Sequence, residues 1–273
     1  MPSIIRPFPF PGSGSNPSEN TIMKYILITG ASSGIGKALS YQFASRGYNL
    51  IITARRQEEL HRLKEDIEGK YEVQVIAKPC DLSQDGQAEN LYRQLAEYDI
   101  SVLINNAGFG DFSMPWDMDV TKATRMLDLN IKALTTLSLL YTRDYADREA
   151  TLINVASVGG YSVFDIAVTY CATKFFVAAF TEGLAQNLQD QDKKMRAKVI
   201  APGPTQSEFV VRSSDNGAIN SDGLFPEESF ITAETLADYI WQLYDSDSTV
   251  GIVSADQSLM LKSPVYPYIR VPH

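Results

Sequence analysis

Short runs of almost continuously apolar residues divide this sequence, and longer amphipathic segments separate them. The runs are YILIT, NLIITA, VQVIA, SVLIN, ATLINVAS and AKVIA. Such runs are typical of parallel strands that are covered on both faces. Between them, apolar residues recur at three- and four-residue steps, as an amphipathic helix requires. The alternation predicts an α/β fold, a doubly wound parallel sheet of about seven strands with helices on both faces.

Two stretches depart from this alternation. Residues 1–22 are rich in proline and glycine and lack periodicity, which favours a flexible extension or a segment added before a natural start at Met23. Proline-rich segments can also bind aromatic grooves. We expect residues 23–273 to form a single domain, with a substrate lid at about 207–230, where the chain becomes polar and irregular. Thr232 is then expected to cap a helix.

Charge and cysteine content narrow the function class. The net charge is −9, which argues against nucleic acid or an anionic membrane surface as a partner. The two cysteines, Cys80 and Cys171, have no metal-type spacing and fit a reducing compartment. No apolar run is long enough to cross a bilayer, and no signal-type stretch begins the chain. We therefore expect a cytoplasmic protein with no metal site.

The first apolar run leads into a glycine-rich turn, YILITGASSGIGKAL, with the spacing G-x-x-x-G-x-G. Glycine permits a tight turn and lets the backbone approach a pyrophosphate, while a helix N-terminus offers free N–H groups. The alternative is a plain strand-to-helix turn with packing glycines, and the strand before and helix after favour a dinucleotide site. The predicted contacts are Gly30, Ser32, Ser33, Gly34, Ile35 and Gly36.

The end of the second apolar run bears on which nicotinamide cofactor binds. An NAD site usually has an acidic side chain there to hold the ribose 2′-hydroxyl. This chain has Ala54, followed by Arg55 and Arg56. A guanidinium can bind a 2′-phosphate bidentately, so the sequence predicts NADP(H) in preference to NAD(H), with Arg55 on the phosphate. Alternatively, both arginines merely begin a polar helix.

Five motifs together resemble the single-domain branch of the short-chain dehydrogenase/reductases. They are TGASSGIG at 29–36, NNAG at 105–108, a serine at 157, YCATK at 170–174 and PG at 202–203. The resemblance runs from about Met23 to Phe209. It implies a Rossmann-type three-layer sandwich and an NADP(H)-dependent oxidoreductase that acts on a carbonyl or alcohol. It also implies a homodimer or homotetramer, formed through long helices at about 118–145 and 170–190.

Tyr170 and Lys174 stand one helical turn apart and hence on one helix face. A nearby ammonium favours the phenolate and lowers the pKa of a tyrosine, which then exchanges protons more readily with a substrate oxygen. The alternative is a chance pair on a helix surface, although the apolar run FFVAAF that follows indicates a buried helix. The resemblance implies that Lys174 also holds the nicotinamide ribose.

Two further residues complete the expected catalytic set. Ser157 ends an apolar run, where its hydroxyl would hold the substrate oxygen, although a lone serine there is usually a turn residue. Asn130 lies among apolar residues of a helical segment, and asparagine is a weak helix former. The resemblance implies that Asn130 holds a water that relays protons to the lysine; it could also bond back to its own helix at a kink.

The remaining cofactor contacts rest on the resemblance. It places Asn106, Ala107 and Gly108 along the adenosine ribose, and Asp81 with Leu82 at the adenine. Asp81 could equally cap the following helix. Around the nicotinamide the resemblance places Pro202, Gly203, Thr205 and Ser207. Ser207 keeps a hydroxyl that is common in the family, whereas Thr205 replaces the usual aliphatic residue.

The expected function is hydride transfer between NADP(H) and a ketone or aldehyde. The expected pocket residues, beside the lid, are Phe109, Met114, Tyr161, Val163 and Phe164, which favour an apolar or aromatic substrate. An alternative is a non-catalytic NADP(H)-binding sensor, which would not need the serine, tyrosine and lysine together. The C-terminal tail departs from the family pattern and leaves the final strand open.

Overall fold

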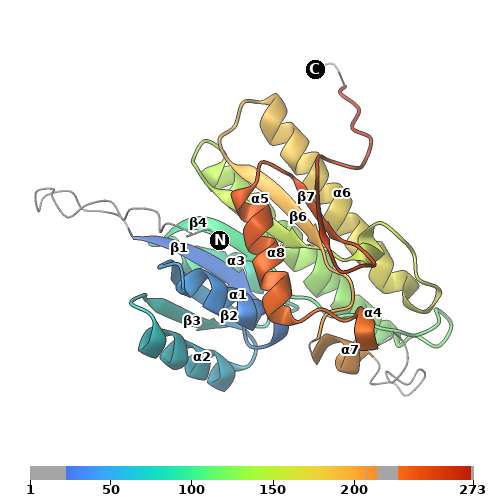
Figure 1. The fold of residues 1–273 in the computed structure, drawn as a ribbon, viewed down its shortest axis with the longest axis horizontal. Coiled ribbons are helices and arrows are strands. Elements are labelled where there is room, and N and C mark those ends of the chain that lie inside the picture. Colours follow the sequence, from blue (N-terminus) through green and yellow to red (C-terminus); the bar gives the residue numbers. More distant parts are fainter. Residues whose placement is uncertain (1–22, 207, 214–226, 272–273) are drawn as a thin grey trace, which may run out of the picture.

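The computed structural model describes residues 23–206, 208–213 and 227–271, which form one sheet with helices on both faces (Figure 1). The strands are β1 (Lys24–Thr29), β2 (Asn49–Ala54), β3 (Val75–Pro79), β4 (Asp99–Asn105), β5 (Thr151–Val155), β6 (Arg196–Ala201), β7 (Val250–Val253) and β8 (Leu259–Lys262). Their order in the sheet is β3-β2-β1-β4-β5-β6-β7-β8. The predicted doubly wound sheet is therefore confirmed.

The last strand differs from the expectation of about seven parallel strands. β1 to β7 are parallel, whereas β8 pairs antiparallel with β7. A tight turn joins them, in which Ser254 N donates to the carbonyl of Ser258 at 2.9 Å. β8 reads LMLK and is half exposed at the sheet edge, so its apolar run is only three residues long and the sequence left this strand open.

Residues along β1 alternate between two cores, one on each face of the sheet. Ile26 and Ile28 pack with residues of α1 (Gly34–Ala44), α2 (Gln57–Lys70) and α8 (Ala233–Asp245). Tyr25 and Leu27 pack with residues of α3 (Gln87–Gln94), α5 (Leu134–Tyr145) and α6 (Val168–Asp190). Successive strand side chains point to opposite faces, so the helices form two outer layers around the sheet. The three-layer sandwich is confirmed.

The strand order reverses between β1 and β4, which opens a crevice beyond their carboxyl ends. The chain builds outward from β1 to β3 and then returns to place β4 on the other side of β1. Asn106 ties the two strand ends together, because its backbone N–H donates to Thr29 Oγ1 at 3.0 Å and its Nδ2 donates to the Thr29 carbonyl at 2.9 Å. In open α/β sheets, ligands bind at such a reversal.

The helical segment expected over about 118–145 consists of three parts. α4 (Val120–Leu127) leads into a π-helical segment, Asp128–Ala133, and α5 follows. A π-helical turn inserts an extra residue into an α-helix and is frequent at functional sites. The segment contains Asn130, the residue singled out in the sequence.

Of the two stretches that depart from the alternation, the N-terminal one lies outside the described residues and the expected lid is described in part. Residues 1–22, Ser207 and 214–226 lie outside the described residues, and with them the proposed extension and most of the expected lid. The described parts of that lid are α7 (Glu208–Ser213) and residues 227–230, which include a short 3-10 helix at Glu227–Ser229. Thr232 caps α8 as predicted, accepting from the Thr235 N–H at 3.0 Å. Within the described ranges, no helix is both long and apolar enough to span a membrane.

Candidate active site

The glycine-rich turn has a geometry that only glycine allows at two positions. Gly30 has φ +70°, and a Cβ there would lie 2.9 Å from Ala107 Cα. A Cβ on Gly36 would lie 2.3 Å from the carbonyl oxygen of Gly30, so the start of α1 packs directly on the turn. Ser33, which precedes α1, makes no side-chain capping bond. The first N–H groups of α1 are thus left for a ligand.

A groove of about 540 Å³ runs past this turn. The lining that it shares with the predicted cofactor contacts is Gly30, Ser33, Gly34, Ile35, Arg55, Asn106, Ala107 and Gly108. These residues come from the first turn, the end of β2 and the end of β4, and the fold brings them together as the sequence led us to expect. A cradle that is closed to any Cβ and faces a helix N-terminus fits a pyrophosphate.

The two arginines after β2 have different surroundings. Arg55 is exposed and lines the groove. Arg56 Nε donates to Ser32 Oγ at 3.2 Å, and its guanidinium pairs with the carboxylate of Glu208 in α7 at 3.1 Å. Ser32 therefore faces Arg56, while Arg55 lines the groove together with Lys122 and Arg125.

Asp81 does not cap the following helix. Its carboxylate accepts from the Ser83 N–H at 3.1 Å and from Ser83 Oγ at 2.7 Å, whereas α3 begins at Gln87 with Gly86 as its N-cap. Burial raises the pKa of Asp81, but the hydrogen bonds from Ser83 and the charge of Arg55 outweigh it and lower the pKa overall. Leu82 is buried in the core, and the adenine contacts stay predictions.

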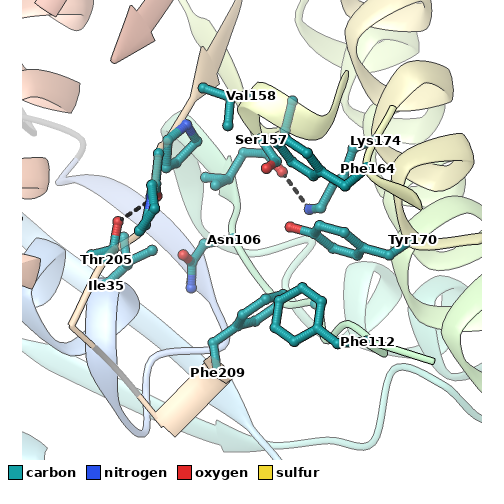
Figure 2. Close-up of a pocket in the computed structure, with 16 residues that line it drawn as sticks. Ile35, Asn106, Phe112, Ser157, Val158, Phe164, Tyr170, Lys174, Thr205 and Phe209 are labelled. Carbon is teal, nitrogen blue, oxygen red and sulfur yellow. Dashed lines mark hydrogen bonds between the residues drawn. The ribbon is translucent and has the colours of Figure 1, made fainter. Parts of the chain in front are cut away.

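Ser157, Tyr170 and Lys174 line one cavity of about 130 Å³ next to the groove (Figure 2). Tyr170 is 7% exposed and Lys174 is 5% exposed. Lys174 Nζ donates to the Val155 carbonyl at 2.9 Å and lies 5.7 Å from the centroid of the Tyr170 ring. Both side chains thus face the same cavity from α6, and they are not a surface pair.

Burial dominates the protonation of this pair. It raises the pKa of Tyr170 above its ordinary value, although a hydrogen bond with Ser157 opposes the shift. Burial also lowers the pKa of Lys174 to about 8. The expected lowering of the tyrosine pKa by the lysine is therefore not found in this state, because desolvation disfavours both charged forms. At neutral pH Tyr170 keeps its proton.

Asn130 links the π-helical segment to the catalytic helix. Its Nδ2 donates to the Phe109 carbonyl at 2.8 Å and to Thr173 Oγ1 at 3.2 Å, and its Oδ1 accepts from the Phe109 N–H at 3.1 Å. A Cβ on Gly108 would lie 3.0 Å from Asn130 Oδ1 and 3.6 Å from Lys174 Nζ. The helix does deviate here, but the amide bonds to other segments and not back to its own helix.

The walls of the cavity differ from the expected set. Of the five expected residues, Phe164 lines the cavity and Phe109 lines the groove. Tyr161 turns away to donate to Glu182 Oε1 at 2.5 Å, Val163 is 63% exposed, and Met114 is not among the described lining residues. Phe112 and Phe209 supply further aromatic walls (Figure 2); sequence reasoning missed Phe112, whereas Phe209 was expected only as an unnamed residue of the lid. Phe209 lies in the expected lid, which was the available signal.

The residues after β6 close the cavity on the nicotinamide side that the resemblance implies. Pro202, Gly203 and Thr205 line it, and Thr205 forms a bridge with Ile231 that ties this loop to the start of the α8 segment. Thr205 Oγ1 donates to the Gly203 carbonyl at 3.0 Å. Ser207, the other residue expected here, lies outside the described residues.

Comparisons with known proteins agree with this architecture. The family model for short chain dehydrogenase matches residues 24–217. The chain is 32% identical over 221 residues to sulfoacetaldehyde reductase 2 of Chromohalobacter salexigens, covering 79% of this chain and 86% of that protein. It is 31% identical over 244 residues to an NADP-dependent 3-hydroxy acid dehydrogenase of Schizosaccharomyces pombe, covering 85% and 90%.

A solved structure has the same architecture. The chain resembles a short-chain dehydrogenase from Sphingobium yanoikuyae in complex with NADPH, with a TM-score of 0.76, 28% identity, and coverage of 84% of this chain and 87% of that one. The family match, the curated relatives and the fold all extend over most of the chain. This protein therefore belongs to the short-chain dehydrogenase/reductase family and is an oxidoreductase that acts on alcohol or carbonyl groups.

Proposed function

We propose that this protein is an NADP(H)-dependent reductase of apolar ketones or aldehydes, with Tyr170 as its general acid and base. The observation that carries the proposal is the convergence of Ser157, Tyr170 and Lys174 on one buried cavity that adjoins the glycine groove. The same groups would serve the reverse oxidation of an alcohol.

The groove fits a dinucleotide phosphate. Gly30, Gly34 and the start of α1 would hold the pyrophosphate, and Arg55 would bind the 2′-phosphate. When bound, the cofactor exchanges a hydride with the substrate carbon. Three observations support NADP(H): Ala54 stands where an NAD site usually has a carboxylate, one relative is named NADP-dependent, and a similar structure holds NADPH.

The proton chemistry is assigned to the cavity. Ser157 Oγ would hold the carbonyl oxygen, and Tyr170 would donate its proton to that oxygen as negative charge develops. Because the pKa of Tyr170 is raised, its hydroxyl is protonated at neutral pH, which suits reduction. Lys174 would then return a proton to Tyr170 and be reprotonated by a water held near Asn130, since Lys174 borders the tyrosine ring and Asn130 lies across Gly108 from the amine.

The cavity walls support an uncharged substrate. Phe112, Phe164 and Phe209 line it, and Lys174 is the one charged residue among the described lining. That lysine donates to the Val155 carbonyl and borders Tyr170, so we assign its remaining N–H groups to the tyrosine and not to a substrate anion. Two relatives are named for sulfoacetaldehyde and for 3-hydroxy acids, which carry acid groups. The aromatic lining of this chain's own cavity nevertheless places its preference with apolar or aromatic carbonyls.

The test combines cofactor titration with turnover. NADPH and NADH are titrated by fluorescence, and NADPH oxidation is followed with aromatic ketones, aliphatic aldehydes and sulfoacetaldehyde, beside a Tyr170→Phe variant. We expect tighter binding of NADPH, faster turnover of the aromatic ketones, and a loss of about 100-fold or more in the variant. Unchanged turnover by Tyr170→Phe would refute the catalytic assignment. Binding of NADPH with no turnover of any carbonyl would favour a sensor.

A further inference from the structure

A buried carboxylate lies in the middle of α6, outside the cavity. Glu182 is 1% exposed. Its Oε1 accepts from Tyr161 Oη at 2.5 Å, and its Oε2 accepts from the backbone N–H groups of Val265 and Tyr266, the latter at 2.9 Å. A carboxylate taken out of water needs such donors. Here they come from two segments that are distant in sequence, the turn after β5 and the stretch after β8.

The stretch after β8 also reaches that turn directly. Tyr266 Oη donates to the Gly160 carbonyl at 2.5 Å. The Tyr266 ring stacks on the Tyr161 ring, with centroids 5.6 Å apart and planes inclined by 16°. Glu182, Tyr161 and Tyr266 therefore form one connected unit, which we call the tyrosine clamp.

The turn held by the tyrosine clamp begins with Ser157. Gly160 N donates to the Ser157 carbonyl at 2.7 Å, and Gly159 N donates to Ser157 Oγ at 3.1 Å. On its other side the turn presses on α6, since a Cβ on Gly160 would lie 2.7 Å from the Lys174 carbonyl oxygen. The turn is thus fixed between the catalytic helix and the C-terminal stretch.

We propose that Glu182, Tyr161 and Tyr266 are positioning residues for Ser157. The inference rests on the proposed function, in which Ser157 Oγ holds the substrate oxygen. None of the three lines the cavity; they act by fixing the backbone of the Ser157–Gly160 turn against α6. Small displacements of a catalytic group reduce turnover strongly, so loosening this turn reduces kcat while cofactor binding is spared.

The experiment uses a matched pair of variants in the full chain. Tyr266→Phe removes the hydroxyl on Gly160 and keeps the stacked ring. Tyr268→Phe removes a hydroxyl from the same stretch, one that donates to Asn187 Oδ1 at 2.6 Å, away from the turn. We expect Tyr266→Phe to lower kcat about tenfold with the KM for NADPH unchanged. Tyr268→Phe should leave kcat and both KM values within about twofold.

A cycle with Ser157→Ala separates this inference from the proposed function. If the clamp acts through Ser157, Tyr266→Phe causes no further loss of kcat in the Ser157→Ala background. An equal loss in both backgrounds, or a loss matched by Tyr268→Phe, would overturn the positioning role and leave a structural one. If Ser157→Ala itself retains full kcat, the proposed function fails first. Should Tyr266→Phe not fold, Tyr161→Phe takes its place in the same cycle.

Discussion

Two lysines are buried in this sandwich, and burial lowers the pKa of each to about 8. Lys174 and Lys198 are 5% and 2% exposed. Lys174 has a single backbone acceptor among its described hydrogen bonds and borders the cavity, whereas Lys198 donates to the carbonyls of Leu243 and Ser246 at the C-terminal end of α8. Burial and a shifted pKa do not by themselves identify an active site, because both lysines share these properties. Only Lys174 of the two also lines a cavity.

The lysines also differ in what they stabilise. Lys198 donates to carbonyls that have no partner within the helix at the C-terminal end of α8, and its positive charge is attracted to the negative end of the helix dipole. Lys174 satisfies only the Val155 carbonyl among the described groups, and its remaining N–H groups lie close to Tyr170 and Asn130. The first arrangement serves stability and the second leaves donors available for chemistry.

The largest expected effect is that of Lys174→Met on turnover. The variant should lower kcat for carbonyl reduction by about 100-fold or more, since Tyr170 loses its neighbouring amine. Its free energy of unfolding should fall by less than that of Lys198→Met, because only the Val155 carbonyl loses its donor while an apolar side chain replaces a buried charge. Steady-state NADPH oxidation and urea unfolding measure the two quantities. Full turnover in this variant would show that Lys174, like Lys198, has no role in the reaction.

Lys198→Met should show the converse. It leaves the Leu243 and Ser246 carbonyls without their donor, and we expect the free energy of unfolding to fall by about 2 kcal/mol. The kcat and both KM values should match the parent protein, because the residue is remote from the cavity. Urea unfolding at neutral pH is the measurement. A variant that is stable but inactive would contradict this reading.

An exposed cation extends the comparison. Arg55→Ala should raise the KM for NADPH about tenfold and leave the KM for NADH unchanged, since only the former carries a 2′-phosphate. Arg56→Ala is the control, because it removes the ion pair with Glu208 and leaves the groove cation in place. Equal effects on both cofactors would show that Arg55 does not read the phosphate.

The smallest expected effect is a pH dependence of stability that Lys198 carries. Its pKa is about 8 in the folded protein, against about 10.4 in an unfolded chain. Between these values the unfolded chain holds a proton that the folded chain has lost, so the free energy of unfolding rises with pH. The difference between the parent and Lys198→Met should therefore increase from pH 8 to pH 10 in urea titrations. A flat difference would mean that Lys198 stays charged.

The sequence predicted those features of the molecule that depend on residues close together in the chain. The apolar runs became β1 to β6, of which the edge strand β3 is only partly buried, and the glycine spacing became the turn at Gly30, on which the nearby Gly36 packs directly. The spacing of Tyr170 and Lys174 likewise predicted a shared helix face. What the spacing could not supply was the degree of burial, which reverses the expected pKa shift of the tyrosine.

Contacts between distant segments were not predictable in this way. Tyr161 was expected in the pocket, but its partner Glu182 and the stacked Tyr266 come from α6 and the C-terminal stretch. Phe112 reaches the cavity from a loop and Phe209 from the short helix α7, and no periodicity in the sequence marks either residue. The half-exposed β8 has an apolar run of only three residues, which is too short to identify a strand by itself. In each case the outcome depends on tertiary packing, which a single sequence does not display.

The π-helical segment at Asp128–Ala133 gives up regular α-helical hydrogen bonding and in return directs the Asn130 side chain. Deleting one residue there would let α4 and α5 merge into an uninterrupted α-helix, the more favourable backbone arrangement. Because the π turn already accommodates the extra residue, the deletion would leave the flanking α4 and α5 side chains in register and would redirect only the residues of the π-helical segment. The amide of Asn130 would swing out of reach of Phe109 and Thr173. At this turn the chain can therefore have either a regular α-helix or an Asn130 side chain that reaches Phe109 and Thr173, but not both.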